Sequence, residues 1–298
     1  MHGVAVRNTE TAADNDASST LFDHLLQDIA WPVIEAKLRL FVAPALSLHP
    51  ESVTLLRAYW GDLGAHMAWN GASYLSKDAA NHLDPSHLLN SLFRSQIAAD
   101  IRPPLNNIIA LFVGDIFCYL SRRGTAEAPG PIPTRVLETL LEAHAIKEKA
   151  NEPLVVLSNS MGCEIMYDIV TSFLPGSPKY SHIKVDFWCG VASQVGLFEE
   201  LKLFLASSEE YGSHRMNRVP FPDRNHLGSW WNVWDDEDVL SYSVRDIIDD
   251  VDDSKFVVGK NLLNEHLGYL QEDRFYLALA EWIEGKKEKS ELINSSPR

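Results

Sequence analysis

A short apolar run that leads straight into a turn of small residues is the feature that most constrains the fold of this chain. The run LVVL at 154–157 has the length and composition of a strand buried on both faces. It continues into SNSMG at 158–162, and then into apolar residues at helical spacing up to about residue 173. Strand, tight turn and helix in this order predict one unit of a parallel sheet.

The same alternation of strand and helix recurs along the chain. Apolar and β-branched runs predict further strands at 53–60, 183–189, 231–234 and 255–258. The spacing of apolar residues predicts helices at 21–42, 135–150, 197–206 and 274–283. We therefore predict an α/β fold, with a mostly parallel sheet and helices on both of its faces.

This fold is expected to form a single domain over residues 1–285, followed by a flexible, charged tail at 286–298. Residues 64–120 look mainly helical and are longer than a simple connection between two strands needs. They form either a helical cap above the sheet or helices packed on it, and the sequence fits both arrangements.

The chain is strongly acidic, with 41 Asp and Glu residues against 26 Lys and Arg and a net charge of −15. Binding to nucleic acid or to an anionic membrane relies on basic residues, so this balance argues against both. No apolar stretch reaches the ~20 residues of a membrane-spanning helix, and the polar residues 8–20 do not resemble a signal peptide. The three cysteines, an odd number, fit reduced thiols. We expect a cytoplasmic protein without an integral membrane segment.

The turn at 158–162 has the residue types that an activated serine needs. A serine at a sharp strand-to-helix turn takes strained backbone angles, so the residues two positions away must be small. Ser158 and Gly162 meet this requirement. The turn would place the Ser160 hydroxyl above the sheet and the Met161 N–H at the start of a helix, where it can donate to an oxyanion. The alternative is an ordinary serine that caps the helix. Strand, turn and helix together favour a nucleophile.

Three short segments of the chain resemble a known family. The SxSxG turn, the opening MHGV at 1–4 and NVWDDEDV at 232–239 are similar to the α/β-hydrolase superfamily, especially its lipase- and esterase-like members. Ser158 stands where the commoner motif has Gly, and Asn159 where many relatives have His, but both fit sterically. The resemblance implies an α/β-hydrolase fold and a catalytic serine, acid and histidine in that order along the chain.

His266 is the candidate base. A serine hydroxyl needs an imidazole to accept its proton, and His266 alone follows the acid region, just before the last predicted helix. Four histidines follow Ser160 in the chain: His182, His214, His226 and His266.

The acid should lie in the loop after the strand at 231–234, where Asp235, Asp236 and Asp238 all qualify by position. Asp followed by a short apolar pair is frequent at this loop in lipase-like relatives, and Asp238-Val239-Leu240 matches that pattern. We choose Asp238 as the acid and Asp235 as the alternative. The remaining carboxylates are expected to be solvated.

The resemblance also implies a second oxyanion donor and raises a difficulty. His2-Gly3 matches a motif that precedes an oxyanion-hole amide, so the N–H of Val4 or Ala5 would act beside that of Met161. In relatives this motif ends a strand that lies between two central strands. Here the sequence begins at the motif, so almost no residues remain for that strand, and a gap would be left between 53–60 and 154–157. We expect either that the natural protein begins upstream of Met1 or that residues 1–6 pair only briefly. We expect an amino-terminal extension with a few apolar residues to raise the melting temperature. An unchanged or lower value would contradict this idea.

The sequence therefore predicts a serine hydrolase that cleaves an acyl bond in a small-molecule or lipid-like substrate, through Ser160, Asp238 and His266. The alternative is a non-catalytic α/β-hydrolase fold used for binding or as a scaffold. A peptidase or thioesterase would use the same residues. Triad chemistry needs no cofactor or metal. His82, Asp84 and His87 have no common zinc spacing, and no phosphate-binding glycine loop is present.

Overall fold

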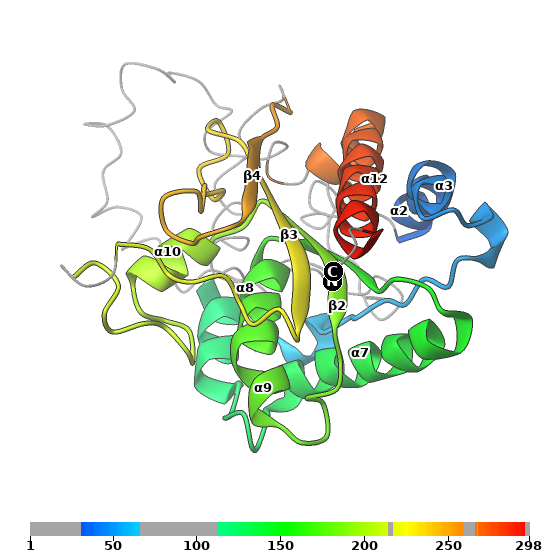
Figure 1. Cartoon of the computed structure of the whole chain (residues 1–298). Coiled ribbons are helices and arrows are strands. Elements are labelled where there is room, and N and C mark those ends of the chain that lie inside the picture. The colour runs from blue at the N-terminus through cyan, green and yellow to red at the C-terminus, as the bar shows by residue number, and fades with distance from the viewer. Residues whose placement is uncertain (1–30, 66–112, 214–216, 259–265, 267, 296–298) are drawn as a thin grey trace, which may run out of the picture.

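The computed structural model describes residues 31–65, 113–213, 217–258, 266 and 268–295, with side chains up to residue 287. Its centre is a four-stranded parallel sheet in the order β1-β2-β3-β4 (Figure 1). The strands are β1 (Val155–Asn159), β2 (Val185–Val191), β3 (Leu227–Trp234) and β4 (Asp252–Lys255). The predicted α/β class, with a parallel sheet and helices, is confirmed.

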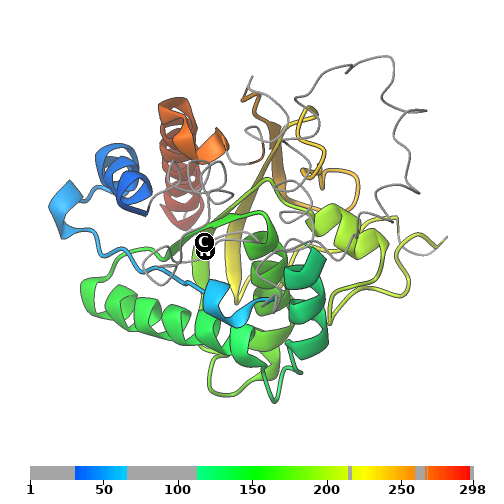
Figure 2. The ribbon, with the colours of Figure 1, turned by 180° about the vertical axis from the view of Figure 1, so that it is seen from behind.

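Helices cover the sheet on both faces. On one face lie α7 (Pro131–Ala150) and α8 (Met161–Asp168), and on the other lies α12 (Asp273–Ser295), beside α2 (Trp31–Lys37) (Figures 1 and 2). The remaining described elements are short: η2 (Leu38–Val42), α3 (Ala43–Ala45), η3 (Pro50–Ser52), η4 (Gly61–Leu63), η5 (Ile169–Phe173), α9 (Leu174–Gly176), α10 (Val195–Glu200) and η6 (Tyr269–Gln271).

Successive side chains of each strand pack alternately into two separate cores, one on each face of the sheet, as the two-residue period of a strand requires. Trp188 and Trp230 stack with ring centroids 4.3 Å apart in the core under α7 and α8. Trp231 lies in the core under α12, where its ring stacks on Trp282 with centroids 5.8 Å apart. Trp230 and Trp231 thus pack into the cores on opposite faces of the sheet. Burial of such large aromatic surfaces on both faces stabilises the sheet strongly.

The register of the strands aligns their carboxyl ends. Asn159 pairs with Val191, and Val191 pairs with Val233. The residues that follow these three strand ends therefore meet at one edge of the sheet. Binding and catalytic groups of parallel sheets gather at this edge.

The predicted strand at 53–60 is not a strand in the structure. The sheet that the described residues form does not include this segment, and residues 53–58 and β1 both line a cavity of about 280 Å³. Residues of both cores line the cavity, including Leu140 on one face and Leu279 on the other. It therefore lies in the plane of the sheet, where the sequence predicted a gap.

Three other predicted boundaries shift. The strand expected at 255–258 lies at Asp252–Lys255, where it pairs with β3. The helix expected at 197–206 is α10, which ends at Glu200, because Lys202 takes a left-handed conformation with φ +56°. The last helix continues to Ser295 and includes most of the tail that we expected to be flexible. Most of the possible cap at 64–120 lies outside the described residues. No helix in the described ranges is long and apolar enough to cross a membrane.

Candidate active site

The turn between β1 and α8 holds Ser160 in a strained conformation. Its φ of +49° and ψ of −131° lie in a region that residues with a side chain rarely adopt. The Ser160 N–H donates to the carbonyl of Val191 at 2.8 Å, and the Ser160 carbonyl accepts from the Cys163 N–H at 2.7 Å. The end of β2 and the first turn of α8 thus fix the backbone on both sides of the serine.

Ser158 has its own role beneath this turn. Its Oγ accepts a hydrogen bond from Trp188 Nε1 at 2.7 Å and donates to Cys163 Sγ at 3.2 Å. All three side chains are buried. A glycine at this position would leave the indole N–H without this acceptor. The presence of serine where the commoner motif has glycine is therefore explained by Trp188, a partner that the sequence did not identify.

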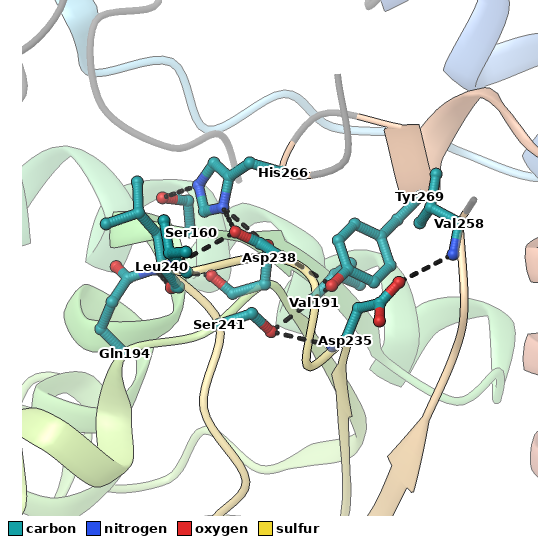
Figure 3. Close-up of polar contacts among 12 residues, drawn as sticks. Ser160, Val191, Gln194, Asp235, Asp238, Leu240, Ser241, Val258, His266 and Tyr269 are labelled. Atoms are coloured by element: carbon teal, nitrogen blue, oxygen red, sulfur yellow. Dashed lines mark hydrogen bonds and ion pairs between the residues drawn. The ribbon is translucent and has the colours of Figure 1, made fainter. Parts of the chain in front are cut away.

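The structure brings Ser160, His266 and Asp238 together (Figure 3). His266 Nε2 lies 2.8 Å from Ser160 Oγ, and His266 Nδ1 lies 2.9 Å and 3.0 Å from the two Asp238 carboxylate oxygens. Carboxylate oxygens accept, so Nδ1 carries the hydrogen and Nε2 is left to accept from the serine hydroxyl. This tautomer and these distances allow the proton of the serine to pass to the imidazole.

Asp238 is held by its own loop. Its side chain is buried, and Oδ1 also accepts from the Leu240 N–H at 3.0 Å. The Tyr269 hydroxyl donates to Oδ2 at a longer 3.4 Å. Burial raises the pKa of Tyr269, which keeps this phenol protonated and a donor. The carboxylate thus meets three donors, of which His266 is the closest.

The alternative acid, Asp235, does not contact His266. The expectation that the other aspartates of this loop are solvated is wrong for Asp235, whose side chain is fully buried. Its carboxylate accepts from the Val258 N–H at 2.8 Å (Figure 3) and from the Glu237 N–H at 3.2 Å, and these hydrogen bonds offset the loss of water. Asp235 therefore ties the loop after β3 to the segment after β4. Asp236 is exposed and pairs with Lys255, as expected for a solvated carboxylate.

The other residues considered from the sequence fall into three groups. His226 contacts the Ile183 carbonyl at 3.3 Å, and His182 packs on His144 with ring centroids 4.9 Å apart, so neither joins the site. Met161 is the first residue of α8, and its N–H has no acceptor within the helix, which leaves it available to an oxyanion. The following predicted residues lie outside the described part of the chain: Val4, Ala5, His82, Asp84, His87 and His214.

Sequence reasoning missed two residues behind the site. Glu164, one turn along α8 from Ser160, is fully buried and accepts from the Gln194 N–H at 2.7 Å. Gln194 in turn donates to the carbonyl of Leu240, next to the acid (Figure 3). A glutamate within the apolar helical run after Ser160 was the signal that could have identified Glu164, and no sequence pattern singles out Gln194.

No family model matches the chain, and neither the search of curated proteins nor that of solved structures found a similar protein. Among the described residues, no group of three or more His, Cys, Asp or Glu side chains could hold a metal ion. All three cysteines are described and free, and Cys163 and Cys189 are buried.

Proposed function

We propose that the protein is a serine hydrolase with an α/β-hydrolase fold, which cleaves an ester-type acyl bond. The observation that carries the proposal is the unbroken chain of contacts from Ser160 Oγ to His266 and on to Asp238. The strained backbone of Ser160 supports it, because strain of this kind gathers at functional sites. A serine that only capped α8 would need neither the imidazole nor the strain.

The reaction follows from these contacts. Ser160 Oγ attacks the carbonyl carbon of the substrate while its proton passes to His266 Nε2. Asp238 stabilises the imidazolium that forms. The Met161 N–H donates to the oxyanion, and such a donor contributes about 3 kcal/mol to the transition state. The family resemblance implies that the N–H of Val4 or Ala5 would be the second donor.

The tetrahedral intermediate then collapses. The bond to the leaving alcohol breaks, and the alcohol takes the proton from His266, which leaves an acyl group on Ser160. A water molecule attacks this acyl-enzyme with His266 again as base, and the acid product leaves. No cofactor or metal enters the mechanism.

The substrate is proposed to be a small or lipid-like acyl ester that approaches from the carboxyl edge of the sheet. The in-plane cavity reaches Ser160 and His266 but runs between β1 and residues 53–58. We do not assign it to the substrate, because the reacting groups of a parallel sheet face the carboxyl ends of its strands.

A panel of acyl esters, thioesters and peptides tests the reaction class with the wild type and Ser160→Ala. The proposal expects ester cleavage in the wild type and none above background in the variant, which removes only one oxygen atom. Preferential cleavage of thioesters or peptides would keep the mechanism and change the class. Equal activity in both proteins would contradict the proposal.

A further inference from the structure

Glu164 is a buried acid with an unusual set of partners. Its side chain is completely inaccessible to solvent, in the first turns of α8. One carboxyl oxygen accepts from the Gln194 N–H at 2.7 Å and lies 3.5 Å from the Ser193 hydroxyl. The other oxygen, Oε2, has no hydrogen-bond partner among the described residues. Burial of a carboxyl group in this way is costly, so it calls for a compensating role.

The partners of Glu164 contact the loop after β3 that carries Asp238, here called the acid loop. Gln194 Nε2 donates to the Leu240 carbonyl and to the Ala192 carbonyl, at 2.5 and 2.7 Å. The Ser193 carbonyl accepts from the Tyr242 N–H at 2.9 Å. The turn after β2 is therefore bonded to the loop after β3 on both sides of Ser241.

The last hydrogen bond of this series involves Asp238, a member of the proposed triad. The Leu240 N–H donates to Asp238 Oδ1, the carboxylate that contacts His266 Nδ1 (Figure 3). Loss of the Gln194 bond to the Leu240 carbonyl would let Leu240 shift. Its N–H, the donor that aligns Asp238, would then move as well. A continuous set of hydrogen bonds thus runs from Glu164 through Gln194 and Leu240 to Asp238.

We propose that Glu164 is a positioning residue, which fixes the Ser193–Gln194 turn so that Gln194 and Leu240 hold Asp238 against His266. This inference rests on the proposed function, because its consequence is the alignment of the proposed triad. Glu164 acts through Gln194 and touches none of the reacting atoms.

The charge state of Glu164 supplies a matched variant. Burial raises its pKa from an ordinary value near 4.5 to about 8, so the carboxyl is mainly neutral at pH 7. The amide of Glu164→Gln has nearly the same shape and no charge, and its oxygen can still accept from the Gln194 N–H. Glu164→Ala removes that acceptor. Tyr119→Phe is the control for buried polar groups, because it removes a hydrogen bond to Asp168 that does not involve the acid loop.

Steady-state kinetics with an ester that the wild type cleaves tests the proposal. Glu164→Ala and Gln194→Ala should lower kcat by about 10- to 100-fold with little change in KM, as small displacements of catalytic groups do. Glu164→Gln should restore the wild-type kcat because it keeps the acceptor, and Tyr119→Phe should leave kcat and KM unchanged. A folded Glu164→Ala with an unchanged kcat would overturn the proposal.

A second measurement does not depend on activity. The His266 Nδ1 proton, bonded to a carboxylate, should give a low-field proton NMR signal, assigned by its loss in Asp238→Ala. The signal should persist in Glu164→Gln and vanish or shift in Glu164→Ala and Gln194→Ala. This pattern in an inactive wild type would contradict the proposed function and leave the positioning role standing. A signal unchanged in Gln194→Ala would overturn that role even if Glu164→Ala fails to fold.

Discussion

The two sides of the site are held in different ways. The side of the proposed nucleophile is fixed by backbone structure: β1 pairs with β2 along its length, and the Ser160 N–H bonds to the end of β2. The side of the proposed acid and base depends on single hydrogen bonds between side chains and the loop backbone. Asp238 accepts from the Leu240 N–H, and Gln194 donates to the Leu240 carbonyl. The difference implies that substitutions of Asp238 or His266 can disturb activity with little effect on the fold. Substitutions beneath Ser160 should do the reverse.

Removal of the imidazole gives the largest expected effect on activity. His266→Ala should lower kcat by about 10⁶-fold, as loss of a triad base does elsewhere. His266 makes its described contacts within the site, so the melting temperature should change little. Kinetics and thermal unfolding of the same preparation check both parts. A large loss of stability would break the comparison between the two sides.

The two buried aspartates sharpen the comparison within the acid side. Asp238→Asn should lower kcat by about 10⁴-fold, because the amide favours the wrong imidazole tautomer. Asp235→Asn should mainly lower stability, because Asp235 bonds to the Val258 N–H rather than to His266. Measurement of kcat and unfolding free energy for both variants checks this. If Asp235→Asn proved the more damaging to kcat, Asp235 would be the functional acid.

The raised pKa of buried Glu164 predicts that the stability of the fold depends on pH. Its pKa is about 8 in the folded protein and near 4.5 when exposed. The folded state therefore binds a proton that the unfolded state has lost between these values, and this contribution to stability falls as pH rises. The expected slope is about 1.4 kcal/mol per pH unit across that window, and it ends above pH 8. Denaturant unfolding should show a shallower fall in Glu164→Gln. The same pH dependence in both proteins would assign it to other groups.

Ser158 gives the smallest effect and tests the nucleophile side. Ser158→Ala leaves the buried Trp188 N–H without its acceptor, which should cost about 1–3 kcal/mol of stability. The turn itself is kept by the backbone, so kcat should stay within a few-fold of the wild type. Chemical unfolding and kinetics check the two expectations. A fall of kcat by orders of magnitude at unchanged stability would show that the turn depends on this side chain.

The sequence predicted the parts of the molecule that local patterns control. The LVVL run predicted β1, and the small residues around Ser160 predicted the turn, because strand, turn and helix are each specified within a few residues. The choice of Asp238 over Asp235 came from the resemblance to lipase-like relatives. The structure places Asp238, and not Asp235, beside His266.

Other contacts between residues far apart in the chain could not be predicted from the sequence. The residues at 53–60 have strand composition, but whether they pair depends on what lies beside β1. The contacts of Trp188 with Ser158 and of Gln194 with Glu164 each join residues about 30 positions apart, and no periodic pattern encodes them. Lys202 ended a predicted helix through its backbone conformation, which its residue type does not favour.

The most direct test of the account is labelling with a fluorophosphonate probe, which reacts with an activated serine hydroxyl. The wild type and Ser160→Ala should be compared, with Ser158→Ala as the matched control from the same turn. We expect labelling of the wild type and of Ser158→Ala, located on Ser160 by peptide mass analysis, and none of Ser160→Ala. A well-folded wild type that does not react, or equal labelling of Ser160→Ala, would contradict the claim that Ser160 is a nucleophile.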